Sequence, residues 1–377
     1  MKNYQVEWRG PVARSSGLGI ASREYVKALK RQGVNVQARA QKSNSSKSLK
    51  FFLIYHYLPD TISFKEERKK YKHILLNTVW ETTRIPRRWL PNINKFDAVC
   101  VPSIQNKQAM RSSGVRVPIF MVPHGVDTKK YKPSNRKLPL REAKGRFVFV
   151  SVFGFQHRKN PEALLKAYWG EFSSADKVIL VIKTNGYAPY ENEQWIKNRI
   201  QSYKRSLGIT KKTAPVLIIA RKLNPIQLKG IYTLGHAFVL PTRGEGVGLP
   251  FLEALSSGIP VITTGWGGHM DFVTTKNSFL VHYNLNNPTI SMNSHHAISH
   301  RFRYLFAEKG QLWAEADISS LKSKMRSAYE NPGLCKQKGH QGRQDMLKLT
   351  WDRAGIALKA ALDKVIRNRR KLIKANL

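Results

Sequence analysis

The chain has 377 residues, of which 41% are hydrophobic and 10% aromatic, so it has enough apolar material for a core and is not globally disordered. Lys and Arg number 65 against 24 Asp and Glu, and the formal net charge of +41 predicts an anionic partner. Two cysteines, Cys100 and Cys335, exclude a disulfide framework and a zinc site built from thiolates alone. No apolar run reaches the roughly 18 residues of a membrane span. Because the first residues also lack a hydrophobic signal core, we expect a cytoplasmic protein, in the host cytoplasm if the protein is viral.

The first third of the chain alternates short apolar runs with segments of helix length. An extended stretch opens it, a glycine-containing loop follows at residues 14–19, and the next segment places apolar residues on one helical face as far as Gly33. Five strand-like runs come next, namely VNVQARA, FFLIYHY, KHILLNTV, DAVCVPS and PIFMVP. Strands that alternate with helices predict a parallel sheet.

The alternation stops and then starts again. Residues 127–145 contain two prolines, many basic residues and no apolar period, so we expect a linker there. Continuously apolar runs follow it, namely GRFVFVSVFGF, KVILVIK, APVLIIAR, HAFVLP and GIPVITT, as in buried parallel strands. We therefore predict two α/β domains, residues 1–140 and residues 141–351, with a last helix at 352–377 that packs back on the first.

The window PTRGEGVGLPFLEALSSGIPVITT is the most informative part of the chain. A strand is expected to end at Pro241, a turn with Gly244, Gly246 and Gly248 follows, and Pro250 suits the first turn of a helix. A helix N-terminus would then face out of the carboxyl edge of a parallel sheet. Unpaired N–H groups and the helix dipole favour a phosphate at such a place.

Two carboxylates accompany this helix start. Glu245 lies in the turn, and Glu253 lies eight residues later, about one turn into the expected helix. Both can line one crevice while they contact different parts of a long polar ligand. The alternative is a solvated pair of glutamates at an ordinary helix start.

Several segments, taken in order and spacing, resemble the retaining glycosyltransferases of the GT-B fold, and within them glycosyltransferase family 4. GEGVGLPFLEALSSGIPVITTGWGGHMDFV is similar to the donor-site segment of that family, FGFQHRKNPEALLKAY to the opening of its second domain, and VPHGVD to the segment before its interdomain linker. SSGLG, WETTRIPRRW and WAEAD (313–317) are similar to one branch of it. The resemblance covers nearly the whole chain and implies two Rossmann-like domains whose parallel sheets face each other across a cleft.

The resemblance implies roles for residues of the second domain. Glu253 matches the carboxylate that holds the ribose hydroxyls of a nucleotide, and Glu245 matches the carboxylate beside the transferred sugar. Lys159 matches the lysine that neutralises the donor diphosphate, and Arg158 is adjacent to it. Backbone N–H groups complete the expected cradle, at Gly246, Val247, Gly248 and Leu249.

Residues of the first domain also match. Gly17 and Gly19 match the loop that closes over the diphosphate, and His56 matches the histidine that faces the sugar, although a lone histidine is as often a structural one. The chain departs from the family at one position, because the family often carries an arginine shortly before the lysine that corresponds to Lys159. Phe155 and Gln156 stand there in this chain. We expect its phosphate contact to be missing or to come from Lys183 or Arg243.

The chemistry explains these residue types. When a glycosyl–diphosphate bond breaks, negative charge grows on the leaving phosphate while the sugar becomes oxocarbenium-like. Lys159, Arg158 and the helix start would stabilise that charge. The expected donor is a nucleotide-diphosphate sugar such as UDP-glucose. Because the chain offers no D-x-D loop, we expect catalysis without a metal or another cofactor.

Two other groups have open interpretations. Trp80, Glu81 and Trp89 either shape an acceptor pocket or pack at the domain surface. The segment HHAISHRFR has three histidines, but their spacing fits no tetrahedral metal template with cysteine partners.

The distribution of charge along the chain indicates where an anionic acceptor would bind. Residues 1–150 carry 31 basic and 9 acidic residues, a denser excess than the rest of the chain has. Two clusters combine basic and aromatic residues, namely RKKYK (68–72) and KKYK (129–132). A third basic cluster, RIPRR (84–88), lies next to an aromatic residue. The predicted contact residues within them are Lys69, Lys70, Arg84, Arg87 and Arg88.

Three acceptors suit this charge, and we rank DNA first. A broad basic face binds a duplex through counterion release, and a hydroxymethylated pyrimidine could be extruded into a pocket, as in viral enzymes that modify their own genomes. A lipid-linked saccharide or glycan at an anionic membrane is the second acceptor, and an acidic polysaccharide or protein is the third. A nucleic-acid-binding protein on a degenerate GT-B scaffold is the non-enzymatic alternative. The oligomeric state is left open.

Overall fold

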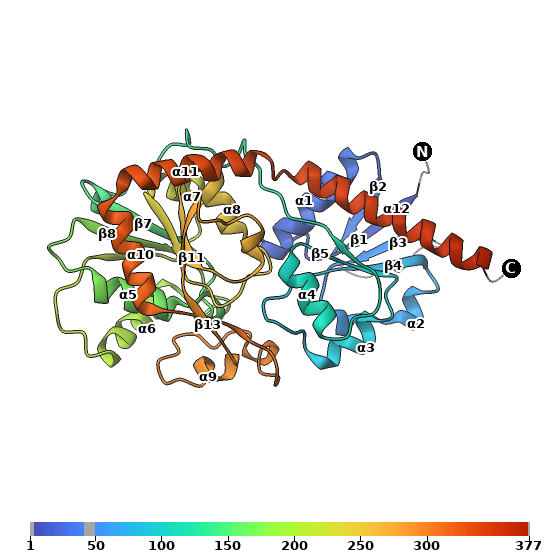
Figure 1. Cartoon of the computed structure of the whole chain (residues 1–377), viewed down its shortest axis with the longest axis horizontal. Coiled ribbons are helices and arrows are strands. Elements are labelled where there is room, and N and C mark those ends of the chain that lie inside the picture. The colour runs from blue at the N-terminus through green and yellow to red at the C-terminus, as the bar shows by residue number, and fades with distance from the viewer. Residues whose placement is uncertain (1–3, 41–49, 376–377) are drawn as a thin grey trace. The chain divides into compact units, whose positions relative to one another are not determined.

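The computed structural model describes residues 4–40 and 50–375 (Figure 1). The chain divides into two compact units, unit 1 being Met1–Gly125 with Leu349–Leu377 and unit 2 being Val126–Lys348. Unit 2 thus includes residues 127–145, for which the sequence predicts a linker. None of the described helices combines the length and the apolar character that crossing a bilayer requires.

Unit 1 is built on six parallel strands in the order β2-β1-β3-β4-β5-β6. Their bounds are β1 Gln5–Arg9, β2 Asn35–Arg39, β3 Lys50–Tyr55, β4 Tyr71–Asn77, β5 Ala98–Val101 and β6 Ile119–Met121. From β1 the chain adds β2 on one side and β3 on the other. The strand order therefore reverses between β1 and β3, and open α/β sheets bind ligands at such a switch point.

The described helices of unit 1 are α1 Gly17–Arg31, α2 Phe64–Glu67, α3 Leu90–Ile93, α4 Ile104–Ser112 and α12 Trp351–Ala375. The two long ones, α1 and α12, pack together. A Cβ at Gly355 of α12 would lie 2.8 Å from backbone atoms of Ala28 in α1, so this close approach requires glycine. The Tyr25 ring of α1 meets the Trp351 ring of α12 edge-on, with centroids 5.3 Å apart.

Unit 2 repeats the design with the strand order β12-β11-β10-β7-β8-β9, again parallel. The bounds are β7 Phe147–Val152, β8 Val178–Lys183, β9 Val216–Ile219, β10 Ala237–Leu240, β11 Val261–Thr264 and β12 Ser278–Val281. The order reverses between β7 and β10. A separate antiparallel pair joins β13 (Tyr283–Asn286) to β14 (Trp313–Ala316).

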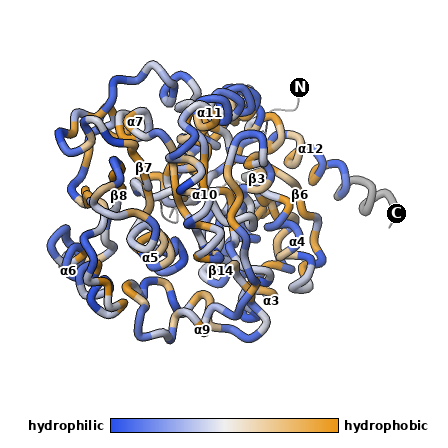
Figure 2. The backbone as a smooth tube through the Cα atoms, turned by 60° about the vertical axis from the view of Figure 1, so that its left-hand side comes forward, coloured by the Kyte–Doolittle hydropathy of each residue, from blue (hydrophilic) through white to orange (hydrophobic). Residues whose placement is uncertain are grey.

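The helices of unit 2 are α5 Pro161–Glu171, α6 Glu193–Ser206, α7 Pro225–Leu234, α8 Leu249–Ser256, α9 Pro288–Met292, α10 Ile318–Glu330 and α11 Pro332–Leu347. Figure 2 shows the hydropathy pattern that drives this layering, since β7 is mostly orange whereas the exposed α6 is mostly blue. Every residue of β10 and β11 is buried. Continuous apolar runs thus form the sheet centre, as the sequence predicts.

The predicted parallel sheets are confirmed in both units, but the glycine segment near the start differs from the prediction. Gly17 and Gly19 lie in the first turn of α1 and not in a loop. The Oγ of Ser16 accepts a hydrogen bond from Gly19 N (3.3 Å) and so caps the helix earlier. A Cβ at Gly19 would lie 2.1 Å from the carbonyl oxygen of Arg14, so the glycine permits this tight entry.

Candidate active site

The switch point of unit 2 brings two predicted donor-site segments together. Strands β7 and β10 are parallel neighbours. The 3₁₀ turn η4 (His157–Lys159) follows β7, and residues 241–248 lead from β10 to α8. Arg243 N donates to the carbonyl oxygen of Arg158 over 2.8 Å. The two segments are therefore joined directly at the carboxyl edge of the sheet.

Local sequence explains how η4 ends. Asn160 adopts a left-handed conformation with φ 57°, which asparagine tolerates better than most residues. Its Oδ1 accepts a hydrogen bond from Ala163 N (3.2 Å), and Pro161 occupies the first position of α5. This cap fixes the end of the turn, immediately after Lys159.

Lys159 and Arg158 converge on the carboxylate of Glu245. The Nζ of Lys159 contacts Oε1 of Glu245, and Nη1 of Arg158 lies 3.5 Å from Oε2. The hydroxyl of Thr242 donates to Oε1 over 3.1 Å. Only 8% of Lys159 and 4% of Glu245 are exposed. The structure thus joins three predicted site residues in one buried cluster, which we call the Lys159–Glu245–Arg158 cluster.

The carboxyl group of Glu245 is ionised in this cluster. Burial alone would raise the pKa of Glu245, but the charges of Lys159 and Arg158 outweigh burial and lower that pKa to about 2. The carboxylate therefore stays ionised at neutral pH. Two cations face one anion, and the surplus positive charge suits a leaving group that gains negative charge.

The start of α8 lies on the same loop. Gly248 has φ +84°, in the left-handed region that favours glycine, and precedes the first residue of the helix. No side chain of the described residues caps this helix, and Pro250 has no N–H to satisfy. The predicted backbone donors lie on the turn that enters the helix, at Gly246, Val247, Gly248 and Leu249. They stay predictions for phosphate contacts.

Replacing Gly248 by alanine should lower both the melting temperature and the affinity for a nucleoside diphosphate. The added Cβ would lie 2.5 Å from the Phe251 ring, and the left-handed backbone adds strain of roughly 1–2 kcal/mol. Thermal unfolding and UDP titration measure the two effects. Gly333→Ala is the matched control, because a Cβ there meets nothing within 4 Å and α11 favours alanine. Equal melting temperatures for the two variants would contradict the prediction.

Glu253 has a different environment from Glu245. It lies in the second turn of α8, where the hydroxyl of Tyr232 donates to its Oε2 over 2.6 Å and Tyr131 provides a second hydrogen bond. Burial raises the pKa of Glu253, although both hydrogen bonds oppose the rise. Tyr131 belongs to the cluster KKYK, yet only 5% of it is exposed. This tyrosine therefore supports Glu253 and does not form part of a solvated basic face.

Arg243 is held by two carboxylates. It is 4% exposed, and its guanidinium binds the carboxylates of Glu162 and Glu315. The structure therefore does not favour Arg243 as the source of the phosphate contact, because the buried Glu162 and the partly exposed Glu315 already use its donors. Lys183 is half-buried and its Nζ donates to the carbonyl oxygen of Thr184 over 2.6 Å, so its role stays a prediction.

His269 lies at the site, although no sequence pattern predicts it there. It lies in the 3₁₀ turn η5 (Gly268–Asp271) after β11 and is fully buried. Burial lowers its pKa, so the ring is neutral, and Nε2 must donate to the carbonyl oxygen of Thr264, 2.9 Å away. Its Nδ1 is then an acceptor without a partner among the described residues. Because Gly268 N donates to the carbonyl oxygen of Glu245 over 2.7 Å, the histidine lies on a turn attached to the cluster. In the sequence, the only feature that could have indicated a role for His269 is that it directly follows two glycines.

His56 lies at the switch point of unit 1. It follows β3, and its backbone N–H donates to the carbonyl oxygen of Arg9 at the end of β1 (2.7 Å). Its Nδ1 is 2.8 Å from the Oγ of Ser22 in α1, whose first turn holds Gly17 and Gly19. The structure therefore brings the three predicted residues of unit 1 to one edge of the sheet.

The imidazole of His56 is neutral. Burial lowers its pKa to about 3. Its Nε2 has no hydrogen-bond partner in the described part of the chain. A neutral histidine can exchange hydrogen bonds with a hydroxyl, but it adds no charge to a site.

The predicted acceptor residues lie on the surface of unit 1. Arg84, Arg87, Arg88 and Lys69 are exposed, and Lys70 is partly exposed. Local acids pair with two of them, since Nε of Arg88 is 3.6 Å from Asp60 and Nζ of Lys69 is 3.5 Å from Glu66. These residues stay predictions for acceptor contacts.

Trp80 and Trp89 are packing residues. They are 2% and 1% exposed, and their rings meet edge-on with centroids 4.7 Å apart. Trp89 donates from Nε1 to Asp60 over 3.0 Å. Packing is therefore favoured over an acceptor pocket for these two tryptophans, although they are buried and do not pack at the domain surface as the alternative interpretation expected.

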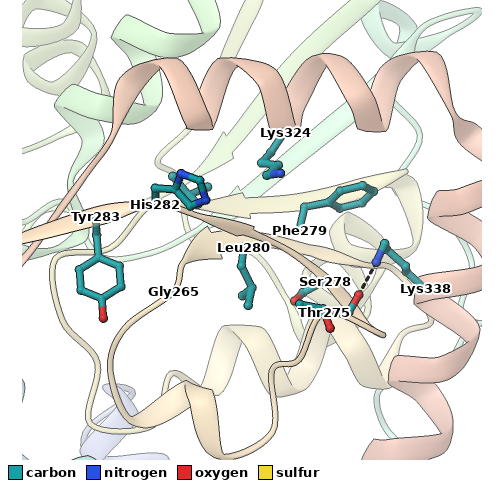
Figure 3. Close-up of a pocket in the computed structure, with 10 residues that line it drawn as sticks. Gly265, Thr275, Ser278, Phe279, Leu280, His282, Tyr283, Lys324 and Lys338 are labelled. Carbon is teal, nitrogen blue, oxygen red and sulfur yellow. Dashed lines mark hydrogen bonds between the residues drawn. The ribbon is translucent and has the colours of Figure 1, made fainter.

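A hollow of about 660 Å³ runs along the edge strand β12 (Figure 3). Lys324 of α10 and Lys338 of α11 line it, and Lys338 lies 5.1 Å from the centre of the Phe279 ring. No lining residue is acidic, and none belongs to the Lys159–Glu245–Arg158 cluster. Across the described residues, no three His, Cys, Asp or Glu side chains group as a metal site would require.

Comparison with known proteins places this geometry in context. Residues 144–289 match the family model described as glycosyl transferases group 1. A curated relative, the lipopolysaccharide core biosynthesis mannosyltransferase LpsB of Rhizobium meliloti (strain 1021), is 26% identical over 195 residues, which is 48% of this chain and 49% of the relative. The chain thus matches about half the length of this relative.

Solved structures show the same fold over nearly the whole chain. Sucrose-phosphate synthase from Thermosynechococcus elongatus aligns with a TM-score of 0.69 at 14% identity, covering 97% of this chain and 100% of that one. HepE of Anabaena, solved with UDP and glucose, aligns with a TM-score of 0.67 at 11% identity, covering 96% and 100%. The predicted α/β fold of GT-B type, with two parallel sheets, is confirmed.

Proposed function

We propose that the protein is a glycosyltransferase that moves a hexose from a nucleotide-diphosphate sugar to a hydroxyl group. The observation that carries the proposal is the buried Lys159–Glu245–Arg158 cluster at the switch point of unit 2, where Glu245 lies on the loop that leads into the uncapped start of α8. The match of residues 144–289 to the group 1 transferases supports it. A protein that only binds nucleic acid has no need of such a cluster.

Each part of the site has a place in the reaction. Glu253 accepts hydrogen bonds from the ribose hydroxyls, and Lys159 with Arg158 neutralises the diphosphate. As the glycosyl bond breaks, the bonding electrons leave with the phosphate, and these cations stabilise the growing charge. Glu245 lies beside the sugar, whose positive charge grows at the same moment. His56, which belongs to unit 1, stays a prediction for a hydrogen bond to a sugar hydroxyl. The acceptor oxygen attacks with retention of configuration, and its proton passes to the departing phosphate.

UDP-hexoses are the first donors to test. A neighbour in fold, HepE, was solved with UDP and glucose. Release of UDP from UDP-glucose or UDP-N-acetylglucosamine, or of GDP from GDP-mannose, identifies the donor even before the acceptor is known, because slow hydrolysis by water needs no added acceptor.

Transfer should not depend on a metal ion. Two fixed cations take the place that a divalent ion holds in metal-dependent sites, so we expect equal rates after dialysis against EDTA and with added Mg²⁺ or Mn²⁺. A rate that falls at least tenfold with EDTA and recovers with metal would contradict this proposal. Lys159→Met should show the same low rate under both conditions.

For the acceptor we propose a hydroxyl of a glycan or lipid-linked glycan at an anionic membrane. The curated relative builds the lipopolysaccharide core, and a net charge of +41 attracts the chain to anionic lipid at about 1 kcal/mol per basic residue near the surface. Hydroxymethylated DNA is the second candidate, and the same charge is the observation that favours it.

One assay separates these acceptors. Labelled sugar is offered with vesicles that carry lipid-linked saccharide, with neutral vesicles of otherwise equal composition, and with duplex DNA with and without 5-hydroxymethylated pyrimidines. Transfer to the lipid-linked saccharide supports the membrane proposal. Transfer that requires the hydroxymethyl group supports DNA modification and overturns it. Binding of DNA without transfer, unchanged in Glu253→Gln, would assign the charge to non-specific attraction.

A further inference from the structure

Two features of unit 2 have no place in the proposed reaction. The segment WAEAD forms β14 and the residue after it, and Arg243 is buried beside it. The Nε of Arg243 lies 2.8 and 2.9 Å from the two carboxylate oxygens of Glu315, and its guanidinium lies 5.7 Å from the ring of Trp313. Trp313 donates from Nε1 to Oε1 of Glu315 over 3.0 Å. Strand β14 therefore holds one side of the Arg243 side chain.

The other side of Arg243 holds the turn η4. Its Nη1 donates to the carbonyl oxygen of His157 and lies 3.1 Å from Oε2 of Glu162. Its backbone N–H donates to the carbonyl oxygen of Arg158 over 2.8 Å. The remaining oxygen of Glu162 binds Nδ1 of His157 at 2.9 Å. Two successive carbonyl groups and one ring of the turn are thus attached to one arginine and its acidic partner.

The network is charged and mostly buried, and the side chain of Glu315 is its most exposed carboxylate, at 23%. Glu162 is 6% exposed. Burial alone would raise the pKa of Glu162, but Arg243 and His157 lower it to about 2, and the two carboxylates raise the pKa of Arg243 against the effect of burial. A buried ion network is weak evidence for added stability, because desolvation offsets the attraction. What it does provide is fixed geometry, since a planar guanidinium accepts its partners only in set directions.

We propose that Glu315 and Arg243 are positioning residues for the donor diphosphate, because they lock η4 so that Lys159 meets it in one orientation. The inference rests on the proposed function and extends it to WAEAD. The lysine itself touches the donor, whereas Glu315 and Arg243 act through the turn. A misplacement of about 1 Å in such a group can cost about 100-fold in rate.

The test is a double-mutant cycle on UDP affinity and on the kcat/KM for UDP release. Arg243→Lys keeps the charge but cannot hold Glu315, Glu162 and the turn together, so we expect a loss of about 10- to 100-fold. In the Lys159→Met background the same change should cost less than about threefold, because the group being positioned is gone. A merely structural arginine would give equal losses in both backgrounds.

Arg326 is the matched control. It also binds two carboxylates, Glu171 and Asp176 at 2.8 Å each, and a carbonyl oxygen, and it lies 4.6 Å from the centre of an aromatic ring. It belongs to unit 2 but contacts neither η4 nor the loop after β10 in any described interaction. Arg326→Lys should therefore leave UDP affinity unchanged.

The rate of amide hydrogen exchange at residues 156–160 measures how firmly the turn η4 is held, and it needs no ligand. Arg243→Lys should speed exchange there and Arg326→Lys should not. If Arg243→Lys fails to fold, Glu315→Gln is measured in the same way, with smaller expected effects in the same direction. Unchanged exchange, or losses that add in the cycle, would overturn the inference. If wild type binds none of the nucleotides, the proposed function fails, and the exchange experiment alone decides the positioning role.

Discussion

Lys159→Met should lower kcat for sugar transfer by about 100- to 1,000-fold, the usual effect of removing one preorganised group that stabilises transition-state charge. The lysine is the closest cation to Glu245 and lies on the loop-facing turn at the switch point. Methionine has a similar length and no charge, so the variant removes the electrostatic contribution with little change in volume. Steady-state kinetics with a UDP-sugar measures the loss.

The same variant should also lose stability, because it leaves Glu245 buried without its nearest cation. Breaking a buried ion pair by removing one partner costs about 3–5 kcal/mol, here reduced by the remaining contacts of Arg158 and Thr242. Adding Glu245→Gln should restore the melting temperature while transfer stays absent. A double variant that regains activity together with stability would show that Lys159 is structural.

Lys197→Met is the control for removing a lysine from an ion pair. Lys197 pairs with Glu193 at 2.7 Å on the exposed side of α6, where such a pair contributes about 0.3–0.5 kcal/mol. Neither stability nor transfer should change measurably. The contrast separates the buried cluster from the many surface cations of this basic chain.

The fold could be predicted because its signals are local. Continuous apolar runs mark β7, β8, β10 and β11, and glycine and proline mark where the loop after β10 turns into α8. The resemblance assigned Lys159, after β7, and Glu245, after β10, to one donor site, and the carboxyl ends of parallel strands share one edge. The buried cluster follows that expectation.

The partners of these residues could not be predicted, because they come from distant parts of the chain. Arg243 was considered only as a source of a phosphate contact, yet it binds Glu162 and Glu315, which are 81 and 72 residues away. Tyr131 sits among lysines in the sequence and nevertheless reaches Glu253. Nothing periodic marks such pairs, since each depends on how the helices and loops of unit 2 pack on its sheet.

Glu253→Gln should bind UDP about 100-fold more weakly than wild type while it melts at a higher temperature near pH 8. The affinity falls because the ribose hydroxyls lose charge-assisted hydrogen bonds worth about 1.5–3 kcal/mol each. Titration with UDP and with 2′-deoxyUDP tests the contact, since wild type should discriminate between them and the variant should not.

The gain in stability follows from the raised pKa of Glu253. A carboxyl whose folded-state pKa exceeds its unfolded value of 4.5 takes up a proton more readily when folded, so it opposes folding as the pH rises above 4.5. The uncharged amide removes that opposition, and the difference in melting temperature between variant and wild type should vanish below about pH 4, where both states carry the proton. Glu193→Gln should behave in the opposite way, because hydrogen bonding to Lys197 lowers the pKa of that glutamate. A destabilised Glu253→Gln with unchanged UDP affinity would mean that this carboxylate serves the packing of Tyr232 and Tyr131, and not the donor.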